Sequence, residues 1–199
     1  MIGFMTFLTD FADQAVILPM VLAVAICLAA RGWSRGAVVF LGAVGITFSV
    51  VLALKLGFLA CQPVFGPWDI RSPSGHTAAA ALFAGGVTAL LTRRLGFVVL
   101  VAGIAAAAIG LSRVVLGFHS VPEVLLGGLA GATGAALLSR VTGPLPPRRP
   151  VSLLAVVSVV AVLLHGIRLP AEAAIWHVSG GALDFVPACR SGDDRQVRP

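Results

Sequence analysis

This chain consists largely of apolar runs of about membrane-spanning length. Short segments that contain arginine separate several of these runs. A helix needs roughly 20 apolar residues to cross the ~30 Å hydrocarbon layer of a bilayer. Six runs reach or approach this length, at residues 15–30, 36–60, 77–91, 96–116, 121–138 and 151–167. The composition, 58% hydrophobic and 11% charged, also differs from that of soluble globular domains. We therefore expect an all-α integral membrane bundle of six transmembrane helices.

The two ends of the chain differ from its apolar middle. Four apolar residues near the N-terminus predict a short helix that lies in the membrane interface. They are Phe4, Phe7, Leu8 and Phe11. Residues 143–150, GPLPPRRP, are too rich in proline to be helical and predict a linker. We expect a membrane domain over residues 1–168 and a polar C-terminal tail over residues 169–199.

Arginines indicate how the bundle lies across the membrane, because short cytoplasmic loops collect Lys and Arg. Three alternate loops contain Arg31 and Arg35, Arg93 and Arg94, and Arg140, Arg148 and Arg149. These loops share one side, which we predict to be cytoplasmic. Both termini and the remaining loops are then expected on the periplasmic or exterior side of the cell inner (plasma) membrane.

The formal net charge of +6 does not indicate a nucleic-acid partner. The arginines separate apolar runs and form no basic stripe with interleaved aromatic residues, so the footprint of phosphate-backbone contacts is absent. The three cysteines, Cys27, Cys61 and Cys189, show no spacing typical of a metal site or a redox motif. A bridge between Cys61 and Cys189 is possible, and nothing in the pattern specifies an oligomeric state.

Polar residues gather at those ends of the apolar runs that lie opposite the arginine-rich loops. They are Lys55, Arg71, Ser74, His76, Ser112, Arg113, His119 and Glu123. Ionisable groups at membrane depth are costly and by default indicate a functional site. Cations together with the free backbone amides of a Ser-Gly-His helix start favour an anion with several oxygens, such as phosphate. Two histidines can then divide the chemistry, one attacking phosphorus and one protonating the leaving oxygen, with no metal or other cofactor required.

Three ordered motifs resemble those of the type 2 phosphatidic acid phosphatase (PAP2) superfamily. Residues 55–63 read K-x6-QP, residues 73–76 read PSGH, and residues 112–123 read SR-x5-H-x3-E. The family pattern is K-x6-RP, PSGH and SR-x5-H-x3-D, and a short six-span chain is similar to its membrane lipid phosphate phosphatases.

The resemblance implies a role for each matching residue. His119 would be the nucleophile that forms a phosphohistidine, His76 the general acid, and Glu123 the carboxylate that orients His119. The phosphate-binding residues would be Lys55, Ser74, Gly75 and Arg113.

Two positions depart from the family pattern. Gln62 replaces an arginine, which removes a cation and its bidentate fork for phosphate oxygens. Arg71, two residues before Pro73, is expected to compensate by pointing into the same phosphate site. Glu123 replaces an aspartate and keeps the carboxylate on a side chain one methylene longer.

Simpler interpretations exist for several of these residues. Ser120-x-x-Glu123 is also a capping box, so Glu123 has a purely structural alternative. Arg71 and Lys55 have the alternative of anchoring helix ends at the interface. His165 and His177 match no motif and are expected to be interfacial residues.

The expected function is hydrolysis of a lipid phosphate or diphosphate at the outer membrane face. Phosphatidic acid, phosphatidylglycerophosphate, undecaprenyl diphosphate and lipid A phosphates present the same terminal group. Two alternatives stay open: a lipid phosphotransferase that uses the same site, and a non-catalytic relative that binds an anionic lipid.

Overall fold

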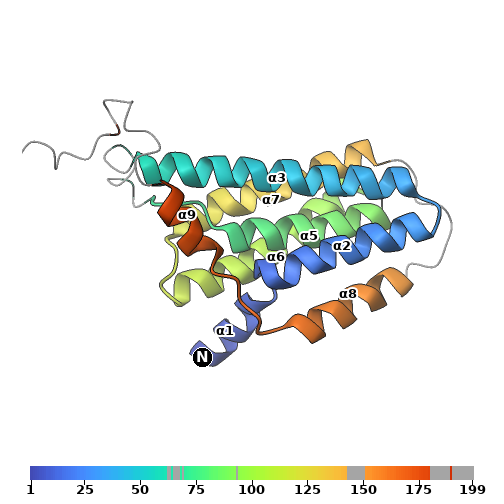
Figure 1. Cartoon of the computed structure of the whole chain (residues 1–199), viewed down its shortest axis with the longest axis horizontal. Helices are drawn as coiled ribbons and strands as arrows, with labels where there is room; N and C mark the ends of the chain where they lie inside the picture. Colours follow the sequence, from blue (N-terminus) through green and yellow to red (C-terminus); the bar gives the residue numbers. More distant parts are fainter. Residues whose placement is uncertain are drawn as a thin grey trace, which may run out of the picture.

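A computed structural model describes residues 1–61, 64, 68, 70–92, 94–142, 151–179 and 189. Within these residues the regular structure is helical, which confirms the all-α prediction (Figure 1). The helices are α1 (Ile2–Asp10), α2 (Gln14–Ala30), α3 (Ser34–Ala60), α5 (Gly75–Leu91), α6 (Leu95–Val115), α7 (Val121–Val141), α8 (Val151–Leu164) and α9 (Ala171–Ser179).

The six predicted runs correspond to α2, α3, α5, α6, α7 and α8, with boundaries that shift by up to three residues. Four helical segments in the described part are long and apolar enough to cross a membrane: Ile2–Ala30, Ser34–Ala60, Leu95–Val115 and Val121–Val141. The apolar helices Gly75–Leu91 and Leu153–Leu164 are shorter. The chain therefore has the character of a multi-pass membrane protein, and the count of six spans stays a prediction.

Helix α5 lies at the centre of the bundle and packs against α2, α3, α6 and α7 (Figure 1). Its sequence, GHTAAAALFAGGVTALL, offers mostly small side chains, which lets neighbouring backbones approach closely. The closest approach is to α7, where a Cβ added at Gly127 would overlap the carbonyl oxygen of Ser74, and one at Gly131 that of Ala78. Glycine at these positions fixes α7 against the start of α5.

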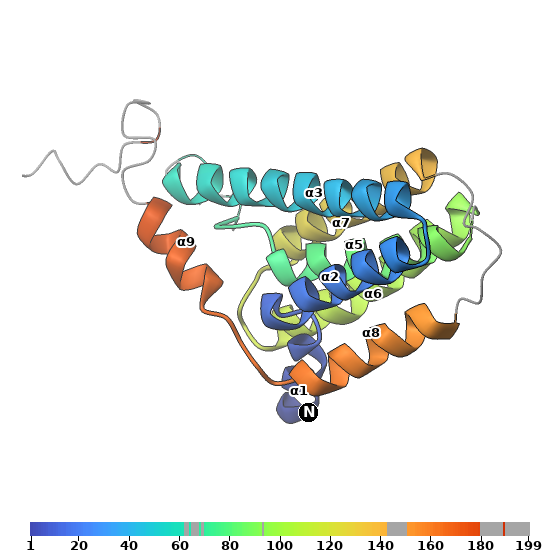
Figure 2. The same ribbon diagram turned by 45° about the vertical axis from the view of Figure 1, so that its right-hand side comes forward.

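The segments outside this core meet at one end of the molecule. Helix α1 packs on α6 and α8 packs on α2, while α9 lies across the C-terminal end of α3 (Figure 2). The connection from α8 to α9 is fastened to the α1–α2 junction, because the Arg168 guanidinium binds both carboxylate oxygens of Asp10 at 2.8 and 3.0 Å. The helix predicted near the N-terminus is thus present as α1, and its placement in the membrane interface stays a prediction.

The bundle has two chemically different ends. The ends of α2, α3, α6 and α7 that lie opposite α9 carry Arg31, Arg35, Arg94 and Arg140, respectively (Figure 1). At the α9 end, a disulfide joins Cys61 and Cys189, so the bridge left open by the sequence is present. Cys27 is a free thiol.

Candidate active site

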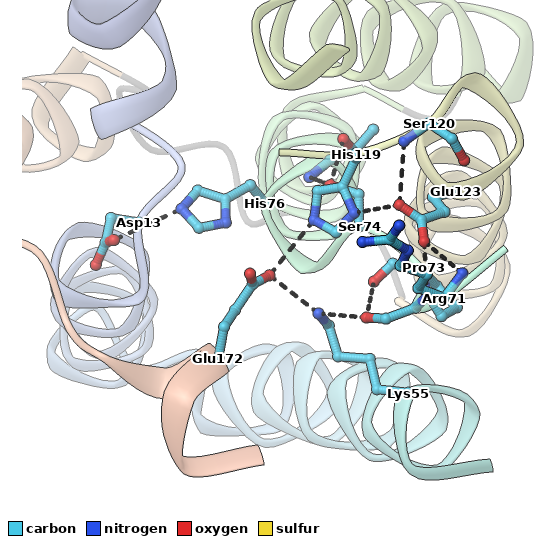
Figure 3. A network of polar contacts seen from close by, with 12 residues as sticks. Asp13, Lys55, Arg71, Pro73, Ser74, His76, His119, Ser120, Glu123 and Glu172 are labelled. Carbon is cyan, nitrogen blue, oxygen red and sulfur yellow. Dashed lines mark hydrogen bonds and ion pairs between the residues drawn. The ribbon is translucent and has the colours of Figure 1, made fainter. Parts of the chain in front are cut away.

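The end of the bundle near α9 gathers polar residues from α9 itself and from five other helices or their ends. Because consecutive helices run in alternating directions, α3 and α6 end there, and α2, α5 and α7 begin there (Figure 1). Figure 3 shows the resulting network, which includes most of the site residues predicted from the sequence. A cavity of about 110 Å³ at its centre is lined by Lys55, Arg71, Ser72, His119, Glu123 and Glu172, among others. Gln62 lies outside the described residues.

The carboxylate of Glu123 orients the ring of His119. Its carboxylate oxygen Oε2 lies 2.7 Å from Nδ1 of His119 and also accepts a hydrogen bond from the backbone N–H of Ser120. The other oxygen accepts hydrogen bonds from the backbone N–H groups of Arg71 and Ser72, both at 2.7 Å. The capping box predicted for the start of α7 is present, and the same carboxylate holds the histidine ring. The structural and functional interpretations of Glu123 are therefore compatible.

This geometry assigns the tautomer of His119. A carboxylate accepts hydrogen bonds, so Nδ1 carries the proton and Nε2 carries the free lone pair when the ring is neutral. Nε2 is buried and has no hydrogen-bond partner among the described residues. The side chain of His119 is 4% exposed, and its Nε2 lies 3.4 Å from an oxygen of Glu172. The nitrogen available for nucleophilic attack therefore faces the cavity.

The PSGH turn forms the start of α5. Ser74 is fully buried and caps the helix, with its hydroxyl accepting hydrogen bonds from the Thr77 amide and hydroxyl. Its own backbone N–H donates to the carbonyl of Glu123 at 3.0 Å, which ties the start of α5 to the start of α7. The remaining amides of this first turn are available to an anion, as is usual at helix N-termini.

Lys55 reaches this turn from α3 and is only 5% exposed. Its ammonium donates hydrogen bonds to the Ser72 hydroxyl and to a carboxylate oxygen of Glu172, both at 3.0 Å. A Cβ added at Gly75 would stand 3.3 Å from Cε of Lys55, so the glycine makes room for the lysine shaft. Lys55 is thus directed inward, and the alternative of a lipid-facing helix anchor does not fit its burial.

Two arginines complete the basic side of the site. Arg113, in the last turn of α6, is buried, and its guanidinium lies 4.3 Å from the ring centre of Phe118. The Nε atom of Arg113 is buried without a hydrogen-bond partner among the described residues, which leaves a donor for an anion. Arg71 is exposed and lines both the central cavity and a neighbouring cavity beside His119.

His76, the second residue of α5, is buried and faces a carboxylate from the N-terminal part of the chain. Its Nε2 lies 3.5 Å from Oδ2 of Asp13 (Figure 3). Its Nδ1 is buried and has no hydrogen-bond partner among the described residues. The two ring nitrogens of His76 are thus in different environments, as are those of His119.

Two carboxylates of the site, Asp13 and Glu172, were not predicted from the sequence. Asp13 precedes an apolar run, where an acidic residue is typical of a helix cap, and Glu172 falls in the segment predicted to be a polar tail. Neither belongs to a motif. Only the packing of α9 across the end of α3 brings Glu172 to Lys55 and His119.

Charge coupling changes the proton affinities of His119, in the connection between α6 and α7, and of Glu172, in α9. Burial alone would lower the pKa of His119, but its contacts with Glu123 and Glu172 outweigh this effect and raise that pKa above its usual value. The contact with His119 and the charge of Lys55 hold the pKa of Glu172 far below its usual range, against the opposite effect of burial. Each of these two groups thus favours the charged form of the other.

The other polar residues singled out in the sequence lie elsewhere. His165 packs against the rings of Phe7 and Phe11, and its Nε2 lies 2.9 Å from the carbonyl oxygen of Phe7. The side chain of His177 lies outside the described residues. In the described part of the chain, no cluster of three or more His, Cys, Asp or Glu side chains is arranged to hold a metal ion.

The fold and this site define a helical protein of multi-pass membrane character, with two histidines and several cations at one end of the bundle. The chain belongs to the PAP2 superfamily, whose sequence model matches residues 36–145. This segment contains all three motifs and spans α3, α5, α6 and α7, whereas Asp13 and Glu172 lie outside it.

A relative is known from Klebsiella pneumoniae, described as an uncharacterized 22.5 kDa protein in the cps region. It is 35% identical over 137 residues, which are 64% of this chain and 64% of the relative. The similarity thus covers slightly less than two thirds of that protein. No solved structure matches the chain significantly.

Proposed function

We propose that this protein is a membrane phosphatase that removes the terminal phosphate of a lipid phosphate or diphosphate through a phosphohistidine on His119. One observation carries the proposal. The 2.7 Å contact between Glu123 and Nδ1 of His119 leaves the lone pair of Nε2 directed into a cavity that Lys55 also lines. Membership of the PAP2 superfamily supports a phosphatase-type reaction.

In the first step, the lone pair of His119 Nε2 attacks phosphorus while the bond to the lipid oxygen breaks. Lys55, Arg113 and the amides of the PSGH turn stabilise the charge on the phosphoryl oxygens. The departing lipid oxygen takes a proton from His76, and Glu123 stabilises the positive charge that develops on the His119 ring.

In the second step, water attacks the phosphorus of the phosphohistidine. His76, which is now neutral, accepts the proton of this water, the P–N bond breaks, and its electron pair returns to Nε2 of His119. Inorganic phosphate leaves, and both histidines regain their starting protonation. The reaction as proposed uses only side chains and backbone amides.

An apolar cavity beside the site supports a lipid as the substrate. This cavity, of about 180 Å³, is lined by Phe48, Val51 and Leu52 of α3 and by Ile175 of α9, while Lys55 and Gly75 lie at its polar edge. A phosphate held by Lys55 would therefore place an attached hydrocarbon chain next to an apolar surface. Phosphatidic acid, phosphatidylglycerophosphate, undecaprenyl diphosphate and lipid A phosphates all have this form.

We place the site at the periplasmic or exterior face of the inner membrane. The Cys61–Cys189 disulfide near the site supports this placement, because disulfides persist mainly in oxidising compartments. The arginines at the opposite end of the bundle support a cytoplasmic location for that end.

The test is phosphate release from the four lipid phosphates by the purified full-length protein in the presence of a chelator. Wild type should release phosphate and, with a phosphate-labelled lipid, form an acid-labile, base-stable covalent label. His119→Ala should lose both signals, because it removes the nucleophile. Labelling that survives this substitution would contradict the assignment.

The same assay separates the two alternative functions. A phosphotransferase would form the label but pass it to an added alcohol in preference to water. A non-catalytic lipid-binding protein would retain lipid phosphate without label or release. Its supporting observation is Gln62, which stands where the family pattern has a phosphate-binding arginine.

A further inference from the structure

Asp13 lies outside the segment that the PAP2 superfamily model matches, yet it is 4% exposed and lies beside the candidate general acid. Its two carboxylate oxygens have different surroundings. Oδ1 accepts hydrogen bonds from the backbone N–H groups of Ala15 at 2.8 Å and Leu169 at 3.0 Å. Oδ2 is directed to Nε2 of His76, at 3.5 Å. One oxygen is therefore structural, and the other faces the site.

Helix capping alone does not account for a carboxylate at this position. Asparagine and serine cap helices about as well as aspartate, since capping needs a single acceptor oxygen. A buried carboxylate is costly unless it is paired with a positive charge or is well hydrogen-bonded. Oδ1 satisfies both structural contacts, so the second oxygen, which faces His76, is not needed for capping.

The geometry around His76 leaves one ring nitrogen for proton transfer. With Nε2 directed to Asp13, the buried and unpartnered Nδ1 is the ring nitrogen that is left for a substrate. The charged groups around the ring are Asp13 from the α1–α2 junction, Glu172 from α9, Arg113 from α6 and His119 from the α6–α7 connection. The two carboxylates favour a protonated imidazole, whereas the arginine, the second histidine and burial oppose it. When a phosphate displaces Glu172, Asp13 is the carboxylate that stays beside His76.

We propose that Asp13 is a positioning residue that acts through His76. Its carboxylate faces Nε2 and orients the ring so that Nδ1 is presented to the leaving lipid oxygen, and its charge favours the protonated ring that donates the proton. This inference rests on the proposed phosphatase reaction. When the P–O bond breaks, the proton on Nδ1 passes to the leaving oxygen, and the proton on Nε2 stays next to Asp13. The ring is then neutral and takes a proton back on Nδ1 from the water that attacks the phosphohistidine.

The test is Asp13→Asn, measured with two substrates that differ in leaving group. Asparagine keeps an oxygen for the Ala15 and Leu169 amides but removes the charge beside His76. For the lipid phosphate that wild type hydrolyses fastest, which has a poor alkoxide leaving group, kcat should fall by about tenfold to a hundredfold, part of the ~10² to 10⁴ typical of general acids. p-Nitrophenyl phosphate has a leaving group that departs with little protonation. Because the substitution weakens only general-acid assistance, kcat for this substrate should fall by less than about threefold. KM should change little for either substrate.

Two controls separate positioning from a structural effect. Asp10→Asn breaks the contact with Arg168 in the same junction but leaves the carboxylate beside His76, so any loss should be equal for the two substrates. In a His76→Ala background, Asp13→Asn should cause no further loss, because its effect passes through that ring. Should Asp13→Asn fold poorly, Asp13→Ser offers a hydroxyl cap without the charge and should give the same substrate dependence.

Equal losses for both substrates, or a full additional loss in the His76→Ala background, would overturn the inference. So would wild-type kinetics in Asp13→Asn. These outcomes differ from failure of the proposed function, in which wild type would neither release phosphate nor form the label on His119.

Discussion

Glu172 occupies the position that a phosphate would take in the proposed reaction, so we expect its removal to strengthen phosphate binding. One carboxylate oxygen lies 3.0 Å from the Lys55 ammonium and 3.4 Å from Nε2 of His119. These two nitrogens are the ones that the proposed reaction needs. The substitution Glu172→Gln keeps the size and hydrogen-bonding capacity of the side chain and removes its charge.

The magnitude follows from the separation and the exposure. Opposite unit charges about 3 Å apart attract by ~1.4 kcal/mol in water and by ~5.5 kcal/mol at an effective dielectric constant of 20. The Glu172 side chain is 38% exposed, so the interaction lies near the lower of these limits. Measured values for exposed pairs, about 0.2 to 1 kcal/mol, point the same way. We expect about 1 kcal/mol, which corresponds to roughly fivefold tighter binding of phosphate.

The same change should shift the pH dependence. Glu172 helps to raise the pKa of His119, so replacing it with a neutral amide should lower that pKa. The nucleophile acts as the neutral ring, and activity therefore rises as pH increases through the pKa of His119. The ascending limb of kcat/KM should move to lower pH in Glu172→Gln.

The assay is competitive inhibition of lipid phosphate hydrolysis by inorganic phosphate, with kcat/KM measured from acidic to mildly alkaline pH. Glu172→Asp is the matched control, because it keeps the negative charge and should stay closer to wild type in both measurements. Weaker inhibition by phosphate in Glu172→Gln, or an ascending limb that moves to higher pH, would contradict this prediction. Either result would mean that Glu172 assists phosphate binding instead of competing with it.

Three further outcomes are expected. If the Arg71 guanidinium binds the phosphoryl oxygens in place of the missing family arginine, Arg71→Ala should lower kcat for lipid phosphate hydrolysis by about 10²-fold or more. A change in kcat within about twofold would instead indicate that Arg71 is an interfacial anchor. Gly127→Ala should lower the thermal unfolding temperature of the detergent-solubilised protein, because its Cβ would overlap the Ser74 carbonyl oxygen and overpacking costs about 1 to 3 kcal/mol; an unchanged temperature would contradict the close packing. Replacing Cys61 and Cys189 by serine should also lower that temperature, and thiol labelling of unreduced wild type should modify Cys27 alone.

The sequence predicted the helices because the signal for each is local. Apolar runs between arginines placed α2, α3, α5, α6, α7 and α8 within a few residues of their observed bounds, since burial in an apolar medium demands a continuous apolar segment. Ser120 and Glu123 predicted a capping box that is present at the start of α7. Helix α9 was not predicted. Its short sequence, AEAAIWHVS, lies in a mixed polar region, and its position depends on packing against α3.

The motif residues could be placed at one end of the bundle because helices of similar length, joined by short loops, bring alternate ends together. The charge balance of the site could not be predicted in this way. Asp13 and Glu172 reach the site from the two flanks of the matched segment, and Glu172 contacts Lys55 across 117 positions of sequence. These contacts depend on the ion pair between Arg168 and Asp10, which joins the segment before α9 to the α1–α2 junction. Such long-range contacts produce no periodic pattern in the sequence. Each motif histidine nevertheless faces one of these carboxylates. The protonation of the proposed nucleophile and acid therefore depends on residues that the three motifs do not contain, so relatives with the same motifs but different flanking segments should differ in their pH dependence.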